Sequence, residues 1–262
     1  MSTLAILGCG NMGGAILRSL LEQHAPPFDR FLAFDPDETK RAGFAPAVAS
    51  SDAVQAVGEA DVVLLATKPQ VMGKVLEPLG DVAGGKLFVS IAAGLPTTFF
   101  EDRLPGGRVV RTMPNTPLLV GHGVVGVCGS ATASSEDVAT AKSLFPTSKV
   151  FDLDESQMDA LTAVSGSGPA YFFYFVECLA AAAADHGFSP DVAYELAAAT
   201  FAGSATLLGS SDADAATLRE RVTSPGGTTA AGLETLRNGN LPILLKACIK
   251  AATRRGRELS QP

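Results

Sequence analysis

Apolar and polar positions change their pattern about 154 residues along the chain. Before that point, short apolar runs typical of buried strands alternate with segments of helical spacing. The apolar runs cover residues 4–7, 31–34, 62–65, 87–91 and 109–110. Strands that alternate with helices predict a mostly parallel sheet with right-handed crossovers. We therefore expect a doubly wound α/β domain over residues 1–154, with further strands of mixed direction at its edge over 124–127 and 150–151.

After residue 154 the strand-like runs disappear and helical spacing takes over. Helices are predicted over 158–164, 169–186, 190–208, 215–222, 228–236 and 242–258. Pro169, Pro190 and Pro242 lie near three of the predicted helix starts, where a missing N–H costs nothing. These helices are rich in alanine and apolar on several faces, so they need a partner surface. Residues 155–262 are expected to form an all-helical domain that joins subunits into a homodimer or a higher homo-oligomer.

Composition and charge exclude several classes of function. The chain has 262 residues and a net charge of −7, which argues against nucleic acid as a partner because phosphate binding needs a basic face. Four scattered cysteines without a C-x-x-C pair suggest neither a metal site nor a disulfide framework. No charged segment precedes an apolar core at the start, and no apolar run is long enough to cross a bilayer. These features predict a cytoplasmic protein without a membrane segment.

A glycine-rich turn follows the first apolar run and precedes a segment of helical spacing. This context supports a dinucleotide fingerprint of the kind found in Rossmann domains. The residues expected to contact the cofactor there are Gly8, Cys9, Gly10, Asn11, Met12 and Gly13. The second apolar run ends at Asp35, about 20 residues after the last glycine, where a carboxylate can bond a ribose 2′-hydroxyl. Asp35 as a simple helix cap is the alternative.

Ligands of an open α/β sheet bind beyond the carboxyl ends of its strands, so the segments that follow the other strands are candidates too. Lys68 can approach phosphates or ribose, small residues after the 87–91 run leave room for a nicotinamide, and Asn115 offers an amide between two prolines. The candidates from these segments are Thr67, Lys68, Pro69, Ala92, Ala93, Gly94 and Asn115. A solvated lysine and a rigid proline turn remain the alternatives.

The turn over residues 222–229 is the most informative segment near the C-terminus. Four hydroxyl side chains surround a Pro-Gly-Gly sequence, and a helix is predicted to follow at once. The first turn of a helix has unpaired N–H groups and a positive dipole end, so it can hold a small carboxylate without an arginine. An ordinary N-cap is the alternative. A second small-residue segment, residues 165–168, opens the helix predicted over 169–186.

Taken together, the motifs 8–13, 67–69, 111–117, 165–171 and 223–229 resemble those of the pyrroline-5-carboxylate reductase family over nearly the whole chain. The resemblance implies NADPH- or NADH-dependent reduction of 1-pyrroline-5-carboxylate to L-proline, the last step of proline synthesis. It implies an N-terminal Rossmann domain and a C-terminal dimerisation domain. It also implies that the Thr229 hydroxyl faces the imine nitrogen, and that the carboxylate is held around Ser224, Gly226, Gly227 and Thr228.

The identity of the cofactor stays open, with a lean to NADH. Asp35 would repel a 2′-phosphate, whereas Lys40 and Arg41 could offset that charge. Two other classes of protein share the glycine turn. A β-hydroxyacid dehydrogenase would need a catalytic lysine on a helix of the second domain, and the helix predicted over 169–186 has none. A dinucleotide-binding regulator without catalysis would have no reason to keep the 224–229 turn.

Overall fold

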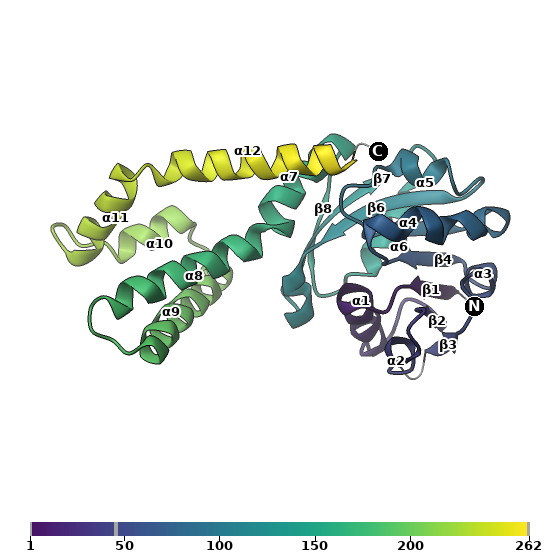
Figure 1. Ribbon diagram of the computed structural model, residues 1–262, viewed down its shortest axis with the longest axis horizontal. Coiled ribbons are helices and arrows are strands. Elements are labelled where there is room, and N and C mark those ends of the chain that lie inside the picture. Colours follow the sequence, from purple (N-terminus) through teal and green to yellow (C-terminus); the bar gives the residue numbers. More distant parts are fainter. Residues whose placement is uncertain (1, 45–46, 261–262) are drawn as a thin grey trace. The chain divides into compact units, whose positions relative to one another are not determined.

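The computed structural model describes residues 2–44 and 47–260 (Figure 1). Its backbone divides into two compact units. The first contains the chain up to Ser167 together with the last turns of the C-terminal helix, from Ala252 onward. The second contains Gly168–Ala251.

The first unit is built on one sheet, which has eight strands within the described residues. Their order is β3-β2-β1-β4-β5-β6-β7-β8. The bounds are β1 Thr3–Leu7, β2 Arg30–Phe34, β3 Val48–Ser50, β4 Val62–Leu65, β5 Leu87–Ser90, β6 Arg108–Pro114, β7 Val124–Gly129 and β8 Lys149–Asp152. All neighbours pair in parallel except β6 and β7, which are antiparallel. The predicted parallel sheet and the mixed direction at its edge are confirmed.

Alternating strand residues build a separate apolar core on each face of this sheet. Leu4 and Ile6 of β1 belong to one core, whereas Ala5 and Leu7 belong to the other. The first core includes residues of α1 (Asn11–Leu21), the 3₁₀ turn η2 (Thr116–Val120) and α6 (Ser135–Ser143). The second includes residues of α3 (Ala53–Gly58), α4 (Pro69–Leu76), η1 (Glu77–Val82) and α5 (Thr97–Glu101). Helices cover both faces, so the doubly wound prediction is confirmed.

The structure differs from the sequence-based expectation at two element boundaries and in two short elements. β6 continues to Pro114, four residues beyond the apolar run over 109–110 that predicted it. Residues 70–79 have helical spacing, but α4 ends at Leu76 and tightens into the 3₁₀ turn η1, whose second residue, Pro78, has no N–H for an α-helical bond. The short elements β3 and α2 (Glu38–Arg41) were not predicted, because they bury too few side chains to leave a periodic pattern.

The connection between the units is helical from Glu155 onward. It consists of the 3₁₀ turn η3 (Glu155–Gln157), α7 (Met158–Leu161) and a π-helical turn, η4 (Thr162–Gly166). In η4 the Ser167 N–H donates to the carbonyl oxygen of Thr162 at 2.8 Å, a bond over five residues. π-Helical turns are rare and often occur at functional sites.

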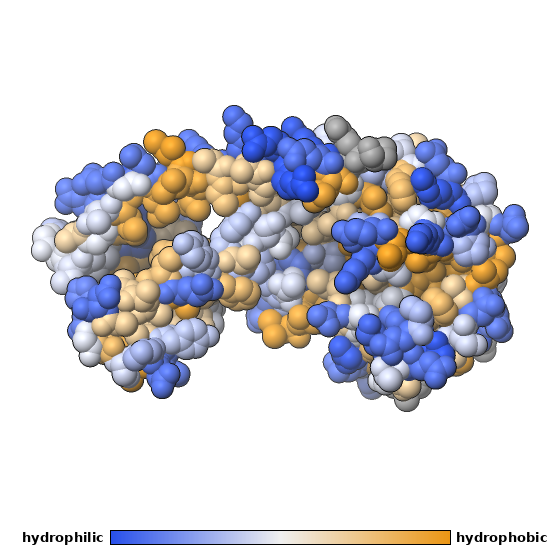
Figure 2. Space-filling model, viewed as in Figure 1, coloured by the Kyte–Doolittle hydropathy of each residue, from blue (hydrophilic) through white to orange (hydrophobic). Residues whose placement is uncertain are grey.

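The second unit is all-helical, as predicted. Its helices are α8 (Gly168–Ala184), α9 (Pro190–Ser210), α10 (Ala215–Arg221), α11 (Thr228–Asn238) and most of α12 (Leu241–Ser260). Phe172 of α8 and Phe201 of α9 pack with their ring centroids 5.5 Å apart. Large apolar side chains nevertheless lie on the surface, among them Phe173, Tyr194 and Ile243. Figure 2 shows apolar surface along α12. No helix among the described residues is long and apolar enough to cross a membrane.

Candidate active site

The glycine turn between β1 and α1 has the backbone that its sequence requires. Gly8 has φ +107°, and a Cβ there would lie 2.7 Å from the carbonyl oxygen of Ala66 on the neighbouring connection. A Cβ on Gly13 would overlap the carbonyl oxygen of Gly8. Gly10 is different, because a Cβ there would meet no atom within 4 Å. The space beyond Gly10 is open, so a ligand can approach the backbone at this point.

Gly10 is also the N-cap of α1, and no side chain caps this helix. The first backbone N–H groups of a helix have no partner within it, and they carry the positive end of its dipole. The first turn of α1 contains no acidic residue. This end of α1 can therefore bind a phosphate group through main-chain donors alone.

Asp35, which follows β2, stabilises the glycine turn through hydrogen bonds. Its Oδ2 accepts a hydrogen bond from the Cys9 N–H at 2.8 Å, and its Oδ1 accepts one from the Asp37 N–H at 3.0 Å. Asp35 is only 7% exposed. The sequence correctly predicted that this carboxylate follows the second strand. It did not reveal the two hydrogen bonds that the carboxylate accepts from the backbone.

Cys9 is buried against the same strand. Its thiol lies 3.7 Å from the carbonyl oxygen of Phe34. Burial, together with the neighbouring Asp35 carboxylate, raises the pKa of Cys9 to about 11, although Arg41 opposes both effects. The thiol is therefore neutral at physiological pH and serves as a small packing group.

A cavity of about 570 Å³ opens beside this turn, at the carboxyl ends of β1, β4, β5 and β6. Nine of the predicted cofactor residues line it: Gly10, Asn11, Met12, Thr67, Lys68, Pro69, Ala92, Ala93 and Asn115. Gly8, Cys9, Gly13, Asp35 and Gly94 do not. Sequence reasoning missed seven lining residues as site residues: Lys40, Ala66, Ile91, Met113, Pro114, Thr116 and Gly166. Strand periodicity located Ile91 without indicating that it borders a cavity.

Lys40 is the missed residue that matters most for charge. Its Nζ lies 3.6 Å from Oδ2 of Asp37, the N-cap residue of α2. The adjacent Arg41 donates to Glu38 at 2.7 Å and to the carbonyl oxygen of Asp35 at 2.9 Å. Both cations near the end of β2 are therefore paired with carboxylates of the same short segment.

Arg111 of β6 forms a buried ion cluster beside this cavity. Its side chain is 4% exposed and pairs with Glu155 of η3, while its Nη2 lies 3.6 Å from Oδ1 of Asp159 in α7. Glu155 in turn accepts a hydrogen bond from the Thr97 N–H at 3.3 Å. These bonds fasten the start of the helical connection to the sheet. A buried arginine in a strand could be predicted to need acidic partners, but the sequence did not identify them.

The turn that precedes α11 has the form predicted for it. Gly226 has φ +68°, and the Gly227 N–H donates to the Ser224 carbonyl oxygen at 3.0 Å. Gly227 is the N-cap of α11 and, like Gly10, has no side-chain cap. Thr228 and Thr229 are the first helical residues and are exposed. Backbone N–H groups and two threonine hydroxyls are thus available at one helix start. This turn lies in the second unit, whereas the cavity lies in the first.

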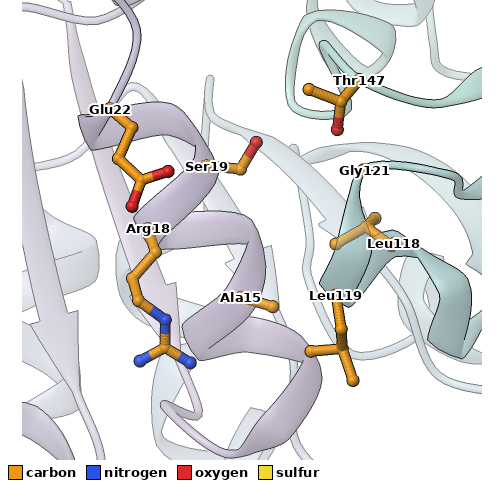
Figure 3. Close-up of a pocket in the computed structure, with 8 residues that line it drawn as sticks. All are labelled: Ala15, Arg18, Ser19, Glu22, Leu118, Leu119, Gly121 and Thr147. Atoms are coloured by element: carbon orange, nitrogen blue, oxygen red, sulfur yellow. The ribbon is translucent and has the colours of Figure 1, made fainter.

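A second, smaller hollow of about 240 Å³ lies between α1 and η2 (Figure 3). Arg18 and Glu22 extend from α1, and Leu118 and Leu119 form part of the wall. The Arg18 guanidinium carbon lies 5.3 Å from the centroid of the Phe44 ring. None of the predicted site residues borders this hollow. Within the described ranges, no group of three or more His, Cys, Asp or Glu side chains is arranged to hold a metal ion.

Two family models match the chain. Residues 155–259 match the model described as pyrroline-5-carboxylate reductase dimerisation, and residues 3–94 match the model described as NADP oxidoreductase coenzyme F420-dependent. A solved pyrroline-5-carboxylate reductase from Coxiella burnetii is 33% identical with a TM-score of 0.93, and the match covers 100% of this chain and 99% of the other. A Plasmodium falciparum pyrroline carboxylate reductase solved with NADP bound is 27% identical with a TM-score of 0.84, over 99% and 98% of the two chains.

Curated relatives extend the similarity to complete sequences. The pyrroline-5-carboxylate reductase of Pseudomonas aeruginosa is 39% identical over 100% of this chain and 98% of the relative. The Mycobacterium tuberculosis enzyme of the same name is 37% identical over 99% of this chain and 97% of the relative. The glycine turn, the uncapped start of α11 and this similarity along the whole length agree, and the chain belongs to the pyrroline-5-carboxylate reductase family.

Proposed function

We propose that this chain reduces 1-pyrroline-5-carboxylate to L-proline with NADH or NADPH. The observation that carries this proposal is full-length similarity to pyrroline-5-carboxylate reductases at up to 39% identity. Family membership favours this reaction over a β-hydroxyacid dehydrogenase and over a dinucleotide-binding regulator. We also propose residues 1–154 as the dinucleotide domain and 155–262 as the substrate-binding and dimerisation domain. The match of the dimerisation model to 155–259 supports that division.

The residues around the cavity fit a dinucleotide. The open space at Gly10 and the uncapped start of α1 suit a pyrophosphate, because main-chain N–H groups there have no other partner. Thr67, Lys68 and Pro69 line the adjacent connection, and the small side chains of Ala92 and Ala93 leave room for a flat ring. Gly8, Cys9, Gly13 and Asp35 shape the turn, and Gly94 follows the two alanines. The cofactor, when bound, supplies the hydride.

The substrate end of the site requires orientation more than acid catalysis. A protonated cyclic imine already accepts a hydride, so the protein must hold the ring and its carboxylate in place. We assign the carboxylate to the N–H groups around Gly226, Gly227 and Thr228, with Ser224 at the turn. The Thr229 hydroxyl donates a hydrogen bond at the ring nitrogen. The positive end of the α11 dipole favours the bound carboxylate.

We propose NADH as the preferred cofactor. A 2′-phosphate needs a free cation, but Lys40 is paired with Asp37 and Arg41 with Glu38. The buried Asp35 adds a third negative charge to the same segment. The Asp37→Asn variant tests this balance, because asparagine caps a helix as well as aspartate and changes only the charge beside Lys40. We expect the NADPH-to-NADH ratio of kcat/KM to rise in Asp37→Asn. An unchanged ratio would contradict the proposal.

We further propose that the active form is a homodimer or larger homo-oligomer joined through the second unit. The dimerisation model matches this part of the chain, and large apolar side chains lie exposed on its helices. Light scattering of the purified protein measures the assembly directly. A monomer with full activity would overturn this part of the proposal.

The reaction itself is tested by following NADH and NADPH oxidation at 340 nm with pyrroline-5-carboxylate, and by identifying L-proline as the product. A 2-ketoacid and a 3-hydroxyacid serve as control substrates. We expect oxidation only with the imine. No oxidation with either dinucleotide, under conditions where the protein binds the dinucleotide, would overturn the proposed reaction.

A further inference from the structure

The side-chain amide of Asn115 is engaged by the protein itself. Its Nδ2 donates to the carbonyl oxygen of Ser165 at 3.2 Å and lies 3.1 Å from the Ser165 hydroxyl oxygen. Its Oδ1 accepts a hydrogen bond from the Val124 N–H at 2.9 Å. The Asn115 amide nitrogen thus lies within hydrogen-bond distance of two oxygens of the same residue, Ser165. Asn115 is only 7% exposed. It is therefore poorly placed to donate to a bound cofactor, although it borders the cavity.

These three bonds join parts of the chain that are distant in sequence. Asn115 follows directly on β6, Val124 begins β7, and Ser165 lies in the π-helical turn η4. Residues 115 and 165 are separated by 50 positions. The Asn115 amide thus binds the end of the helical connection, at η4. Arg111 binds the start of that connection through Glu155.

The sequence explains why η4 needs an outside donor. In a continuous α-helix the carbonyl oxygen of Ser165 would accept from the N–H of residue 169. Residue 169 is proline, which has no N–H. The Ser165 carbonyl oxygen is partly buried, and a partly buried carbonyl oxygen without a partner destabilises the turn. Asn115 supplies the missing donor.

The position of η4 sets part of the cavity wall. Gly166, the next residue after Ser165, lines the cavity together with Met113 and Asn115. Met113 packs so closely on Gly166 that a Cβ at residue 166 would lie 2.8 Å from its Cε. A shift of η4 therefore moves both Gly166 and Met113. These two residues border the cavity on the β6 side, near Ala92 and Ala93, where the proposed function has the nicotinamide.

We propose that Asn115 is a positioning residue for hydride transfer: it holds η4 through Ser165, so that Met113 and Gly166 form a fixed wall beside the reacting ring. This inference rests on the proposed function. It predicts a loss of kcat when the hydrogen bonds between Asn115 and Ser165 are removed, because the nicotinamide ring is then held less precisely. Dinucleotide affinity should change little, since the phosphates bind elsewhere in the cavity.

The test uses Asn115→Ala, Ser165→Ala and the double variant in the full chain. We expect Asn115→Ala to lower kcat about 10- to 100-fold, as misplacement of reacting groups by about 1 Å does. The Kd for NADH, measured by fluorescence, should change less than about threefold. Ser165→Ala keeps the carbonyl acceptor and should lose less, and the double variant should be no worse than Asn115→Ala. Additive losses would show that Asn115 and Ser165 act independently, and a raised Kd with unchanged kcat would show a direct contact of Asn115 with the cofactor. Either result would overturn the proposal.

Hydrogen exchange of the peptide that covers η4 gives a readout independent of substrate. We expect exchange over residues 162–168 to be about tenfold faster or more in Asn115→Ala. Adding Pro169→Ala restores a backbone N–H that can reach Ser165, so this double variant should regain protection. If it exchanges as fast as Asn115→Ala alone, the Ser165 carbonyl is not the group held, and the proposal fails. A lower melting temperature with wild-type kcat would assign Asn115 a structural role only and would also overturn it. Hydrogen exchange needs no catalysis, so it tests the hydrogen bonds between Asn115 and Ser165 even in a protein that failed to reduce pyrroline-5-carboxylate.

Discussion

The Cys9 N–H donates a hydrogen bond to Oδ2 of Asp35 at 2.8 Å, which ties the glycine turn to the end of β2. Asp35 therefore has two separable effects. It fixes the turn that precedes α1, and it keeps a negative charge beside the turn. The first effect acts on NADH and NADPH alike, because both contain the pyrophosphate. The second opposes only the 2′-phosphate.

Replacing Asp35 by serine should therefore change two quantities. The Kd of both dinucleotides should rise, because the Cys9 N–H loses its acceptor. The NADPH-to-NADH ratio of kcat/KM should also rise, because a charge that opposes the 2′-phosphate is removed. Asp35→Asn is the matched control, since its amide oxygen can still accept from Cys9 while the charge is gone. A ratio that stays at the wild-type value in both variants would show that Asp35 does not govern cofactor choice.

Cys9 should be nearly inert toward alkylating reagents. Because its pKa is raised to about 11, only about one thiol in a thousand is ionised at pH 8. Cys178 is exposed and provides an internal comparison. Iodoacetamide followed by peptide mass spectrometry should label Cys178 at least about 100-fold faster than Cys9. Comparable rates at the two cysteines would contradict the buried, neutral thiol.

Much of this fold was predictable because most strands of the first unit are buried on both faces and stand out as apolar runs. Two exceptions are β3, which buries too few side chains to be recognised, and β6, where Arg111 interrupts the apolar run and hid the second half of the strand. The glycine turn was recognisable because residues 8 and 13 lie too close to neighbouring backbone atoms for any residue with a Cβ. The roles of Asp35 and Asn115 were harder to predict, since a polar side chain in a sequence does not reveal whether it bonds to a ligand or to the backbone.

The Asp137 carboxylate should stabilise the first unit in a pH-dependent way. Burial alone would raise the pKa of Asp137, but hydrogen bonds from Ser134 and the Arg108 guanidinium outweigh it, so the pKa is lower than the usual 3.8. A lowered folded-state pKa means that the stabilisation is present above about pH 3.8 and is lost as the pH falls below it. Asp137 also forms the capping box of α6 with Ser134.

Asp137→Ala should therefore lower the free energy of unfolding by about 1–3 kcal/mol at pH 7. The difference from wild type should shrink as the pH falls below about 4, where the wild-type carboxylate becomes protonated. Urea unfolding at several pH values measures both quantities. A difference that does not depend on pH would show that the hydrogen bonds of Asp137 matter and its charge does not.

Removing the Thr229 hydroxyl should impair catalysis without weakening cofactor binding. Thr229→Val keeps the shape of the side chain but not the donor, and kcat should fall about 10- to 1,000-fold, equivalent to about 1–4 kcal/mol. The Kd for NADH should stay near the wild-type value, because residue 229 does not line the cavity proposed to hold the dinucleotide. Thr229→Ser restores a hydroxyl and should recover most of the activity. Wild-type turnover in Thr229→Val would exclude Thr229 as the donor.

The last prediction concerns whether one active site uses residues of two subunits. Gly10→Asp should abolish dinucleotide binding without disturbing the fold, because a Cβ at residue 10 would meet no atom within 4 Å and the added charge repels a pyrophosphate. Thr229→Val removes the substrate donor. In a hybrid dimer of the two variants, sites shared between subunits would leave one site that has both an intact Gly10 and an intact Thr229. Sites formed within one chain would leave none.

Co-expression of the two variants in equal amounts should make about half of the dimers hybrids, each with one working site out of two. The mixture should then recover about a quarter of the wild-type activity if sites are shared. Two affinity tags allow the hybrid to be isolated, and it should show about half of the wild-type activity per dimer. Each variant expressed alone provides the background. Activity of the isolated hybrid at that background would show that the Thr229 turn serves the cofactor cavity of its own chain.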